Sequence, residues 1–311
     1  MRVASDTFSN NLMFQLNVLQ DRQNRLQTQA ATGQKITLPE DDPAAMREVL
    51  DLQTQSHAVT QYQTNITSLQ QVATASYNII DGLKTISDRA GEIATQADGL
   101  ASPQQLSAYA TEVDNLIKQT VQLANTKNNG NYLLGGTRTD APPFAVTTDS
   151  NGNITAVSYQ GNTDVASNEI APNTIVSAQT LGANSTGAGP RGLITDSRSG
   201  ADFINHLIAL RNDLTSGNTA AITATDQKNL AKDEDNILYH VSANGALQSR
   251  LETTSSLASQ QNLSLNSQIS QETGADLAQT LTQLSQAQTA YQAALQSGAK
   301  IMGMSLLNFI Q

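Results

Sequence analysis

The sequence contains no cysteine and no tryptophan, and aromatic residues make up only 4% of its 311 residues. Without thiols, neither a disulfide framework nor a thiolate metal site can form. Small-molecule pockets are lined mainly by hydrophobic and aromatic side chains, so the low aromatic content disfavours an enzyme with such a pocket. The 38% of hydrophobic residues still supply cores, and the length suits about two domains. Polar positions are filled mainly by Gln, Asn, Ser and Thr, which is typical of long helices packed through small side chains.

Positive charge is also scarce, with 17 basic against 27 acidic residues and a net charge of −10. No cluster of Lys and Arg occurs, so the chain would repel phosphate backbones, and we expect no nucleic acid partner. No run of about 18 apolar residues is present, so no segment is expected to cross a membrane. The first residues lack the basic and apolar regions of a cleavable signal peptide. If the protein is secreted, we expect a route that uses no such signal.

Periodicity divides the chain into three regions: a helical part to about residue 129, a Gly/Asn/Thr-rich middle to about residue 200, and a second helical part. In the middle region, turn signals surround short β-prone runs such as ITAVSYQ. The predicted fold class is therefore mainly α, with a long-helix coiled coil or bundle built from both chain ends and a small β domain inserted between them. We expect five segments: an N-terminal amphipathic helix and loop at 1–42, a first bundle half at 43–135, a β-rich outer domain at 136–200, a second bundle half at 201–274, and a C-terminal amphipathic helix at 275–311.

The first helix carries an apolar stripe with alternating spacings of four and three residues, and Gly33 ends the pattern. The next helix is predicted to begin at Asp42 and Pro43, because a carboxylate can accept the free backbone N–H groups and proline needs no donor at the first helical position. Asp41, Asp42 and Pro43 are therefore interpreted as a helix-cap motif. The alternative, a carboxylate pair for acid-base work or cation binding, is less favoured.

From Tyr62 to Ala97 the same spacing continues over about five heptads, and isoleucines repeating every seven residues widen the apolar face. This pattern predicts a bundle rather than a two-stranded coil. Ser102, Pro103 and Gln105 predict a capping box at the start of a third helix, and the Asn-Asn-Gly sequence at 128–130 is expected to end it. Helical spacing resumes at Phe203, and after Gly217 one long polar helix is expected to run to about Gly274.

The C-terminal segment repeats the four-three spacing, with almost no charge for salt bridges. A long helix of this kind at a chain end cannot bury its stripe against itself, so it needs a partner, first the N-terminal stripe and then a neighbouring subunit. The predicted assembly residues are Leu12, Leu16, Leu19, Leu26, Leu277, Leu281, Leu284, Tyr291, Leu295, Met302, Leu306 and Phe309.

Other groups with potential chemistry favour structural interpretations. His57, His206 and His240 each lack a second His or a Cys at metal-ligand spacing and are expected at the surface or the bundle edge. The acidic run at 233–235 predicts a solvated face, and the glycine-rich stretch at 182–192 lacks the residues of a phosphate loop and predicts a flexible turn region. We expect no catalytic residue, no metal and no cofactor.

Three motifs, in order along the chain, carry a resemblance to a known family. TGQKITLPEDDPAAM at 32–46, NYLLGGTRTDAPPF at 131–144 and ALQSGAKIMGMSLLNFIQ at 294–311 resemble the bacterial flagellin superfamily, over about residues 1–145 and 200–311. Asp41-Asp42-Pro43, TRTDAPPF and SLLNFIQ are more similar to the junction proteins between hook and filament than to filament flagellins. The resemblance implies a structural, non-enzymatic subunit, exported by the flagellar type III apparatus and located in the extracellular flagellum.

The resemblance also implies partners. They would be hook-associated protein 1 on the hook side, flagellin on the filament side, copies of the chain in a helical or ring array, and a flagellar export chaperone on the C-terminal helix. Paired terminal helices would lie innermost in the assembly and the β domain outermost. Two alternatives remain: a filament flagellin, and a helical sensory or signalling coiled-coil module. The second would require a transmembrane or ligand-pocket element.

Overall fold

The computed structural model describes residues 2–97 and 99–310, and the side chains of residues 10–97 and 99–300. Long helices form most of this chain and short strands occupy its middle, which confirms the predicted mainly α fold class. The chain forms two compact units. Unit 1 comprises Met1–Ala58 and Gln261–Gln311, and unit 2 comprises Val59–Gln260. No helix in the described ranges is long and apolar enough to cross a membrane.

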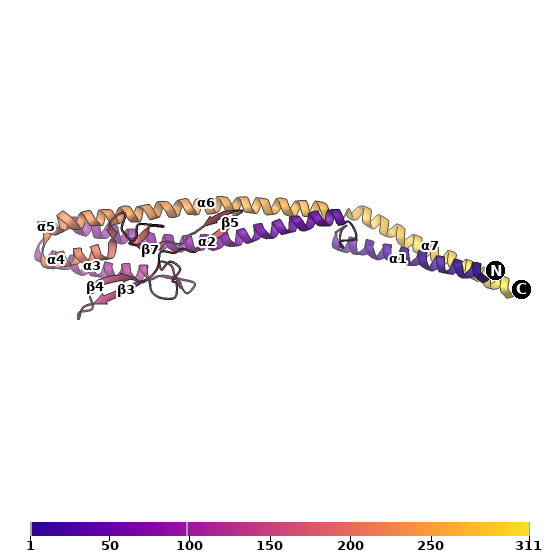
Figure 1. Ribbon diagram of the computed structural model, residues 1–311, viewed down its shortest axis with the longest axis horizontal. Coiled ribbons are helices and arrows are strands. Elements are labelled where there is room, and N and C mark those ends of the chain that lie inside the picture. Colours follow the sequence, from indigo (N-terminus) through magenta and orange to yellow (C-terminus); the bar gives the residue numbers. More distant parts are fainter. Residues whose placement is uncertain (1, 98, 311) are drawn as a thin grey trace. The chain divides into compact units, whose positions relative to one another are not determined.

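Unit 1 is built around two terminal helices, α1 (Arg2–Thr32) and α7 (Leu277–Ile310), which lie side by side (Figure 1). It also contains the beginning of α2 (Pro43–Gln96) and the end of α6 (Gln227–Thr273). The two connections in this unit are joined to each other, because the Lys35 N–H donates to the Thr273 carbonyl (2.6 Å) and the Ala275 N–H donates to the Gly33 carbonyl (2.8 Å). These two backbone hydrogen bonds thus join the segment that follows α1 to the segment that precedes α7.

Unit 2 is a helical bundle whose main seam was predicted from sequence. The predicted seam lies in α2 and ends at Ala97, directly after it. Every seam residue from Ile66 to Ala97 is buried, and Tyr62 is half-buried. Ile79, Ile86 and Ile93 are buried as well, which confirms that α2 contacts more than one neighbour. The other helical elements of the unit are α3 (Pro103–Ala124), α4 (Phe203–Ser216), α5 (Thr219–Ala221), a π-helical segment η1 (Ile222–Asp226) and most of α6.

The start of α3 was predicted correctly and its end was not. Ser102 and Gln105 form the expected capping box, with Pro103 in the first turn. The helix ends at Ala124, before the Asn-Asn-Gly sequence. Instead, Asn129 (φ 51°) and Gly130 (φ 86°) form the turn between the short strands β1 (Lys127–Asn128) and β2 (Asn131–Tyr132). Positive φ at both central residues suits a tight hairpin, so this dipeptide starts the β region.

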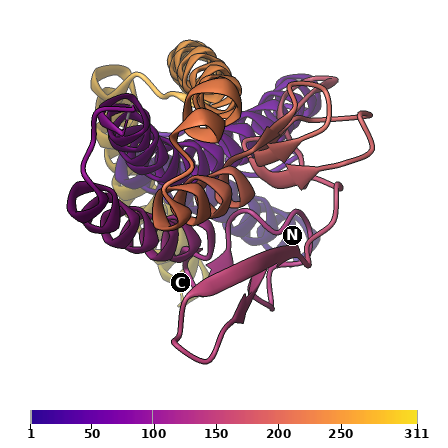
Figure 2. The same ribbon diagram turned by 90° about the vertical axis from the view of Figure 1, so that its left-hand side faces the viewer.

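The middle region forms small separate sheets rather than one continuous sheet. Strands β3 and β4 form an antiparallel hairpin, as do β5 and β6, while β8 pairs with β7 in parallel and with β9 in antiparallel orientation. In the end-on view these strands lie to one side of the helices of unit 2 (Figure 2). Their bounds are β3 (Phe144–Thr148), β4 (Ile154–Tyr159), β5 (Asn168–Ala171), β6 (Thr174–Val176), β7 (Leu181–Asn184), β8 (Gly192–Asp196) and β9 (Ala201–Asp202).

Buried polar side chains of α6 attach the strands to the bundle. The amide nitrogen of Asn236 donates to the carbonyls of Gly192 and Leu193 (both 2.9 Å). Asp233 accepts the N–H of Asp202 (2.8 Å), and His240 contacts the Gly192 carbonyl through Nε2 (3.2 Å). These side chains satisfy backbone groups that would otherwise be buried without partners. The predicted solvated face was therefore wrong for Asp233, although Glu234 and Asp235 are exposed, and His240, which was expected at the surface or the bundle edge, is buried. The packed strands supply the partners of both buried side chains.

The glycine-rich stretch at 182–192 is also more ordered than predicted. The buried side chain of Asn184 donates to the carbonyls of Ala188 and Pro190 (both 2.6 Å) and so closes the loop on itself. At Gly192 an added Cβ would collide with the backbone of Thr195 and of Asn184, so only glycine fits this close approach. The prediction of a flexible turn region was therefore wrong: this stretch is an ordered loop between the strands β7 and β8.

Candidate assembly site

The N-terminal stripe packs against the C-terminal helix within one chain. Leu26 is buried and Leu12, Leu16 and Leu19 are half-buried on the face of α1 that lies along α7. Their four-three spacing places all four on one side of the helix. These predicted residues therefore already have an intramolecular partner.

On α7 the line of closest packing coincides only in part with the predicted stripe: it includes Leu284 and Tyr291 but leaves Leu277, Leu281 and Leu295 to one side. Buried or half-buried residues follow four-three spacing from Thr280 to Gly298 and are mostly small. At Gly298 an added methyl group would meet the side chain of Leu12, so the helices approach closely there. Small side chains allow this approach, which explains why they form the contact. The line comprises Thr280, Leu284, Ala287, Tyr291, Ala294 and Gly298.

The larger leucines of α7 lie beside that line and stay accessible to solvent. Leu277, Leu281 and Leu295, here called the leucine flank, are 48%, 56% and 44% exposed. The predicted residues Leu284 and Tyr291 are half-buried in the line of closest packing with α1, here called the pairing line. The side chains of the predicted residues Met302, Leu306 and Phe309 lie outside the described part of the chain. A single copy thus leaves three leucines of α7 partly uncovered.

A second apolar surface on α1 was missed by the sequence analysis. Met13, Phe14 and Val18, here called the outer face of α1, are all exposed, and Phe14 reaches 68%. At about 100° per residue, Phe14 points roughly opposite to Leu12 and so away from α7. Phe14 and Val18 stand four residues apart, and this i, i+4 spacing was the signal available in the sequence. The helix pair therefore presents apolar side chains on two sides.

The motif at 41–43 fixes the loop between α1 and α2. Asp42 Oδ1 accepts the N–H groups of Ala44 and Ala45 (both 3.1 Å), and α2 begins at Pro43. Asp41 faces the other way: its Oδ2 accepts the N–H groups of Thr37 (3.1 Å) and Leu38 (3.0 Å). Hydrogen bonds from the backbone of Thr37 and then of Leu38 hold the pKa of Asp41 below its usual value. The two carboxylates thus stabilise two adjacent pieces of backbone.

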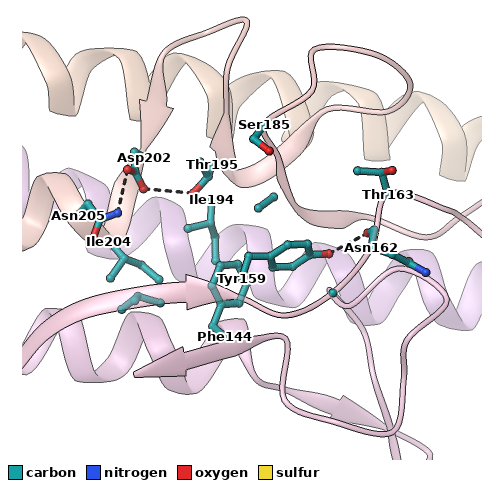
Figure 3. Close-up of a pocket in the computed structure, with 13 residues that line it drawn as sticks. Phe144, Tyr159, Asn162, Thr163, Ser185, Ile194, Thr195, Asp202, Ile204 and Asn205 are labelled. Atoms are coloured by element: carbon teal, nitrogen blue, oxygen red, sulfur yellow. Dashed lines mark hydrogen bonds between the residues drawn. The ribbon is translucent and has the colours of Figure 1, made fainter. Parts of the chain in front are cut away.

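A groove of about 390 Å³ opens in unit 2 between the β3–β4 hairpin and the strands β8 and β9 (Figure 3). The Tyr159 hydroxyl donates to the carbonyls of Leu134 (2.9 Å) and Asn162 (3.1 Å). Asp202 accepts hydrogen bonds from Thr195 (3.2 Å) and Asn205 (2.8 Å). These polar groups pair with one another and hold the strands in place. Within the described residues, no group of three or more His, Asp or Glu side chains is arranged to hold a metal ion.

Comparison with known proteins finds similarity to flagellar proteins. Residues 3–139 match the bacterial flagellin N-terminal helical region. The flagellar hook-associated protein 3 of Salmonella typhimurium is 26% identical over 98% of this chain and 98% of its own length. The protein of the same name from Escherichia coli is 25% identical over 96% and 98%. The chain is thus similar to flagellar hook-associated proteins over nearly its whole length, and its N-terminal part matches the flagellin family.

Solved structures show the same fold. A putative flagellar hook-associated protein from Vibrio parahaemolyticus matches with a TM-score of 0.64 at 21% identity, over 75% of this chain and all of its own. FlgL of Bacillus cereus matches with a TM-score of 0.55 at 22% identity, over 71% of this chain and 99% of its own. Both relatives that match over nearly their full length are named flagellar hook-associated protein 3.

Proposed function

We propose that this chain joins the hook to the filament outside the cell and that it assembles through the paired helices α1 and α7. The observation that carries the proposal is the leucine flank, in which three leucines remain about half exposed on one side of α7. Covering the remaining surface of each leucine would contribute roughly 1 kcal/mol, since full burial of a leucine is worth about 1.5–3 kcal/mol. A contact repeated around an assembly adds these contributions for every copy.

The second apolar surface supports contacts with more than one neighbour. The outer face of α1 points away from α7, so a partner on that face does not compete with a partner on the leucine flank. Two different surfaces on one subunit suit a head-to-tail arrangement, which closes into a ring or continues as a helix. We therefore propose copies of the chain in such an array as the first partners of this site.

The other partners follow from the proposed position between two structures. Hook-associated protein 1 would bind on the hook side and flagellin on the filament side, while an export chaperone would cover α7 before assembly. Segments 1–42 and 275–311 would form the inner layer, 43–135 and 201–274 the bundle around it, and 136–200 the outer surface. Buried polar contacts between α6 and the strands support placing the strands as a fixed cover of the bundle.

A filament flagellin is the second candidate, because the matching family region is that of flagellins. The two functions differ in self-assembly. A junction subunit adds mainly to a hook-side neighbour, whereas a flagellin adds to copies of itself without limit. We expect the purified chain to form no long filaments, alone or with flagellin seeds of its own species, under conditions in which flagellin elongates those seeds. Electron microscopy of both mixtures is the measurement, and micrometre-long filaments of this chain alone would favour the flagellin assignment.

A further inference from the structure

Two histidines lie where α6 meets the strands β8 and β9 in unit 2, and their chemical settings are opposite. His206 Nδ1 lies 2.7 Å from Asp233 Oδ2, whereas His240 Nε2 lies 3.2 Å from the carbonyl oxygen of Gly192. Ionised carboxylates and carbonyls only accept hydrogen bonds, so both imidazoles donate. One histidine therefore faces a charged acceptor and the other a neutral one.

The His206 contact belongs to a junction of three elements at the end of β9. Asp233 Oδ1 accepts the N–H of Asp202 (2.8 Å), so one carboxylate of α6 binds both β9 and the first turn of α4. The Asp233 side chain is fully buried, and that of His206 is 17% exposed, so the imidazole can exchange a proton with solvent. The dipole of α4 disfavours a positive charge in this first turn, so the Asp233 carboxylate is the group that stabilises the protonated ring.

The His240 contact holds the beginning of β8. The residue is buried, and its Nε2–H donates to the carbonyl of Gly192, the first residue of β8. The charges of Arg191 and Arg198 act against a positive charge on the ring, and Asp196, which acts in its favour, is already paired with Arg198 (2.7 Å). A proton added to His240 would therefore charge a buried group whose hydrogen-bond partner is neutral, which costs free energy.

The pKa values of the two histidines differ in the direction that these settings imply. Burial lowers the pKa of His206, but the hydrogen bond and charge of Asp233, with the charge of Asp202, outweigh it and raise that pKa above the ordinary 6.5. For His240, burial is the largest effect, and the pKa lies below 6.5. Burial also raises the pKa of Asp233, so both partners of that pair take up protons more readily in the fold.

We propose that His206 and His240 make the attachment of the strands to α6 respond to pH in opposite directions at two ends. Acid tightens the β9 end, where a proton on His206 completes an ion pair, and loosens the beginning of β8, where a proton on His240 has no charged partner. Higher pH reverses both effects. Asp233 and His240 are about 10 Å apart along α6, so one end can open while the other is held.

The pH range of each response follows from the ordinary histidine pKa of 6.5. Because the pKa of His206 is raised in the fold, its contribution is fully present below 6.5 and is lost as the pH rises through the folded value. Because the pKa of His240 is lowered, its contribution is present above 6.5 and is lost as the pH falls through the folded value. If the chain lies outside the cell, as proposed above, the medium sets this pH, but the two responses do not depend on that location.

Other charged groups near His206 require a control. Lys232 of α6, Asp202 of β9 and Asp226 of η1 all face it. Asp226 is the last residue of the π-helical segment, which interrupts the long helix predicted after Gly217, and burial raises the pKa of this aspartate to about 6. The variant Asp226→Asn removes that titration. Both responses of the strands are expected to survive in it, because Asp226 contacts neither β8 nor β9 among the described hydrogen bonds.

Hydrogen exchange of the full-length chain, with rates corrected for the intrinsic effect of pH, measures both ends. On going from about pH 8 to about pH 5.5, amides of residues 201–206 are expected to open about threefold less often, and amides of residues 192–194 about threefold more often. His206→Gln should abolish the first response only and His240→Gln the second only, because glutamine can donate to the same oxygen but does not titrate. Each variant is thus the matched control for the other.

Titration of the imidazole signals by NMR provides a second measurement that does not depend on opening rates. The sequence has three histidines, and His57, which is exposed on α2, serves as the reference signal. The pKa of His206 is expected above 6.5 and that of His240 below it. The reverse order would overturn the proposal. So would a response of both segments in the same direction, or a segment that keeps its response when its own histidine is replaced by glutamine.

Discussion

Leu295→Asp is expected to abolish incorporation of the subunit into the flagellum while leaving the melting temperature of the free chain almost unchanged. Leu295 belongs to the leucine flank and is 44% exposed in a single copy, so a carboxylate there can stay hydrated. If the flank is covered by a neighbouring copy, the same carboxylate enters a dry contact at a cost of several kcal/mol unless it is paired or protonated. That cost exceeds the roughly 1 kcal/mol that the native leucine contributes.

Gln296→Asp is the matched control, since it adds the same charge one residue later at an exposed position. The pairing line runs from Thr280 to Gly298, and Gln296 points roughly away from it. Export, incorporation into flagella and the thermal melt of the purified protein should be measured for both variants. A large fall in the melting temperature of Leu295→Asp would show that this leucine belongs to the core of the single chain. Normal incorporation would show that the leucine flank is not an assembly surface.

Asn236→Leu is expected to lower the free energy of unfolding of unit 2 by about 2–4 kcal/mol. The side-chain amide of Asn236 donates to two buried carbonyls, those of Gly192 and Leu193. Leucine has a similar volume but no donor, so both carbonyls would lose their partner while remaining buried. Urea unfolding followed by circular dichroism measures the change. Asp235→Asn, at an exposed neighbouring position, should have an effect below about 0.5 kcal/mol, and an equally small effect of Asn236→Leu would contradict the role of α6 in holding the strands.

The helices could be predicted from sequence because their signals are local and repetitive. The four-three spacing from Tyr62 to Ala97 identified the buried seam of α2, and Ser102 with Gln105 identified the start of α3. A heptad pattern records which side of a helix avoids water, and a capping box involves neighbouring residues only. Neither signal depends on the rest of the fold.

The contacts that the sequence analysis did not predict are contacts between residues that lie far apart in the sequence. Asp233 and His240 resembled solvated polar residues because their partners, Asp202 and Gly192, lie on strands more than 30 residues away. The π-helical segment η1 likewise has no periodic signature in the sequence. Burial of a polar group follows from the donors and acceptors that packing brings to it, which composition and spacing do not record.

The contacts between the terminal helices α1 and α7 could be predicted only in part, for a related reason. The predicted stripe of α7 included Leu284 and Tyr291, which lie in the contact with α1, but not the small residues Ala287 and Ala294, which lie there too. Hydrophobicity alone ranks leucine above alanine or glycine, whereas close helix packing favours the smaller side chains. The leucines are therefore left on the outside, where they are available to another subunit.

The location of the protein on intact flagella tests the central claim most directly. Immunogold labelling with an antibody against residues 136–200, the segment proposed to lie outermost, should give a single band where the hook meets the filament. A strain that lacks this chain should have hooks without filaments and no labelled band. Continuous labelling along the filament would contradict the account and assign the chain as a filament subunit.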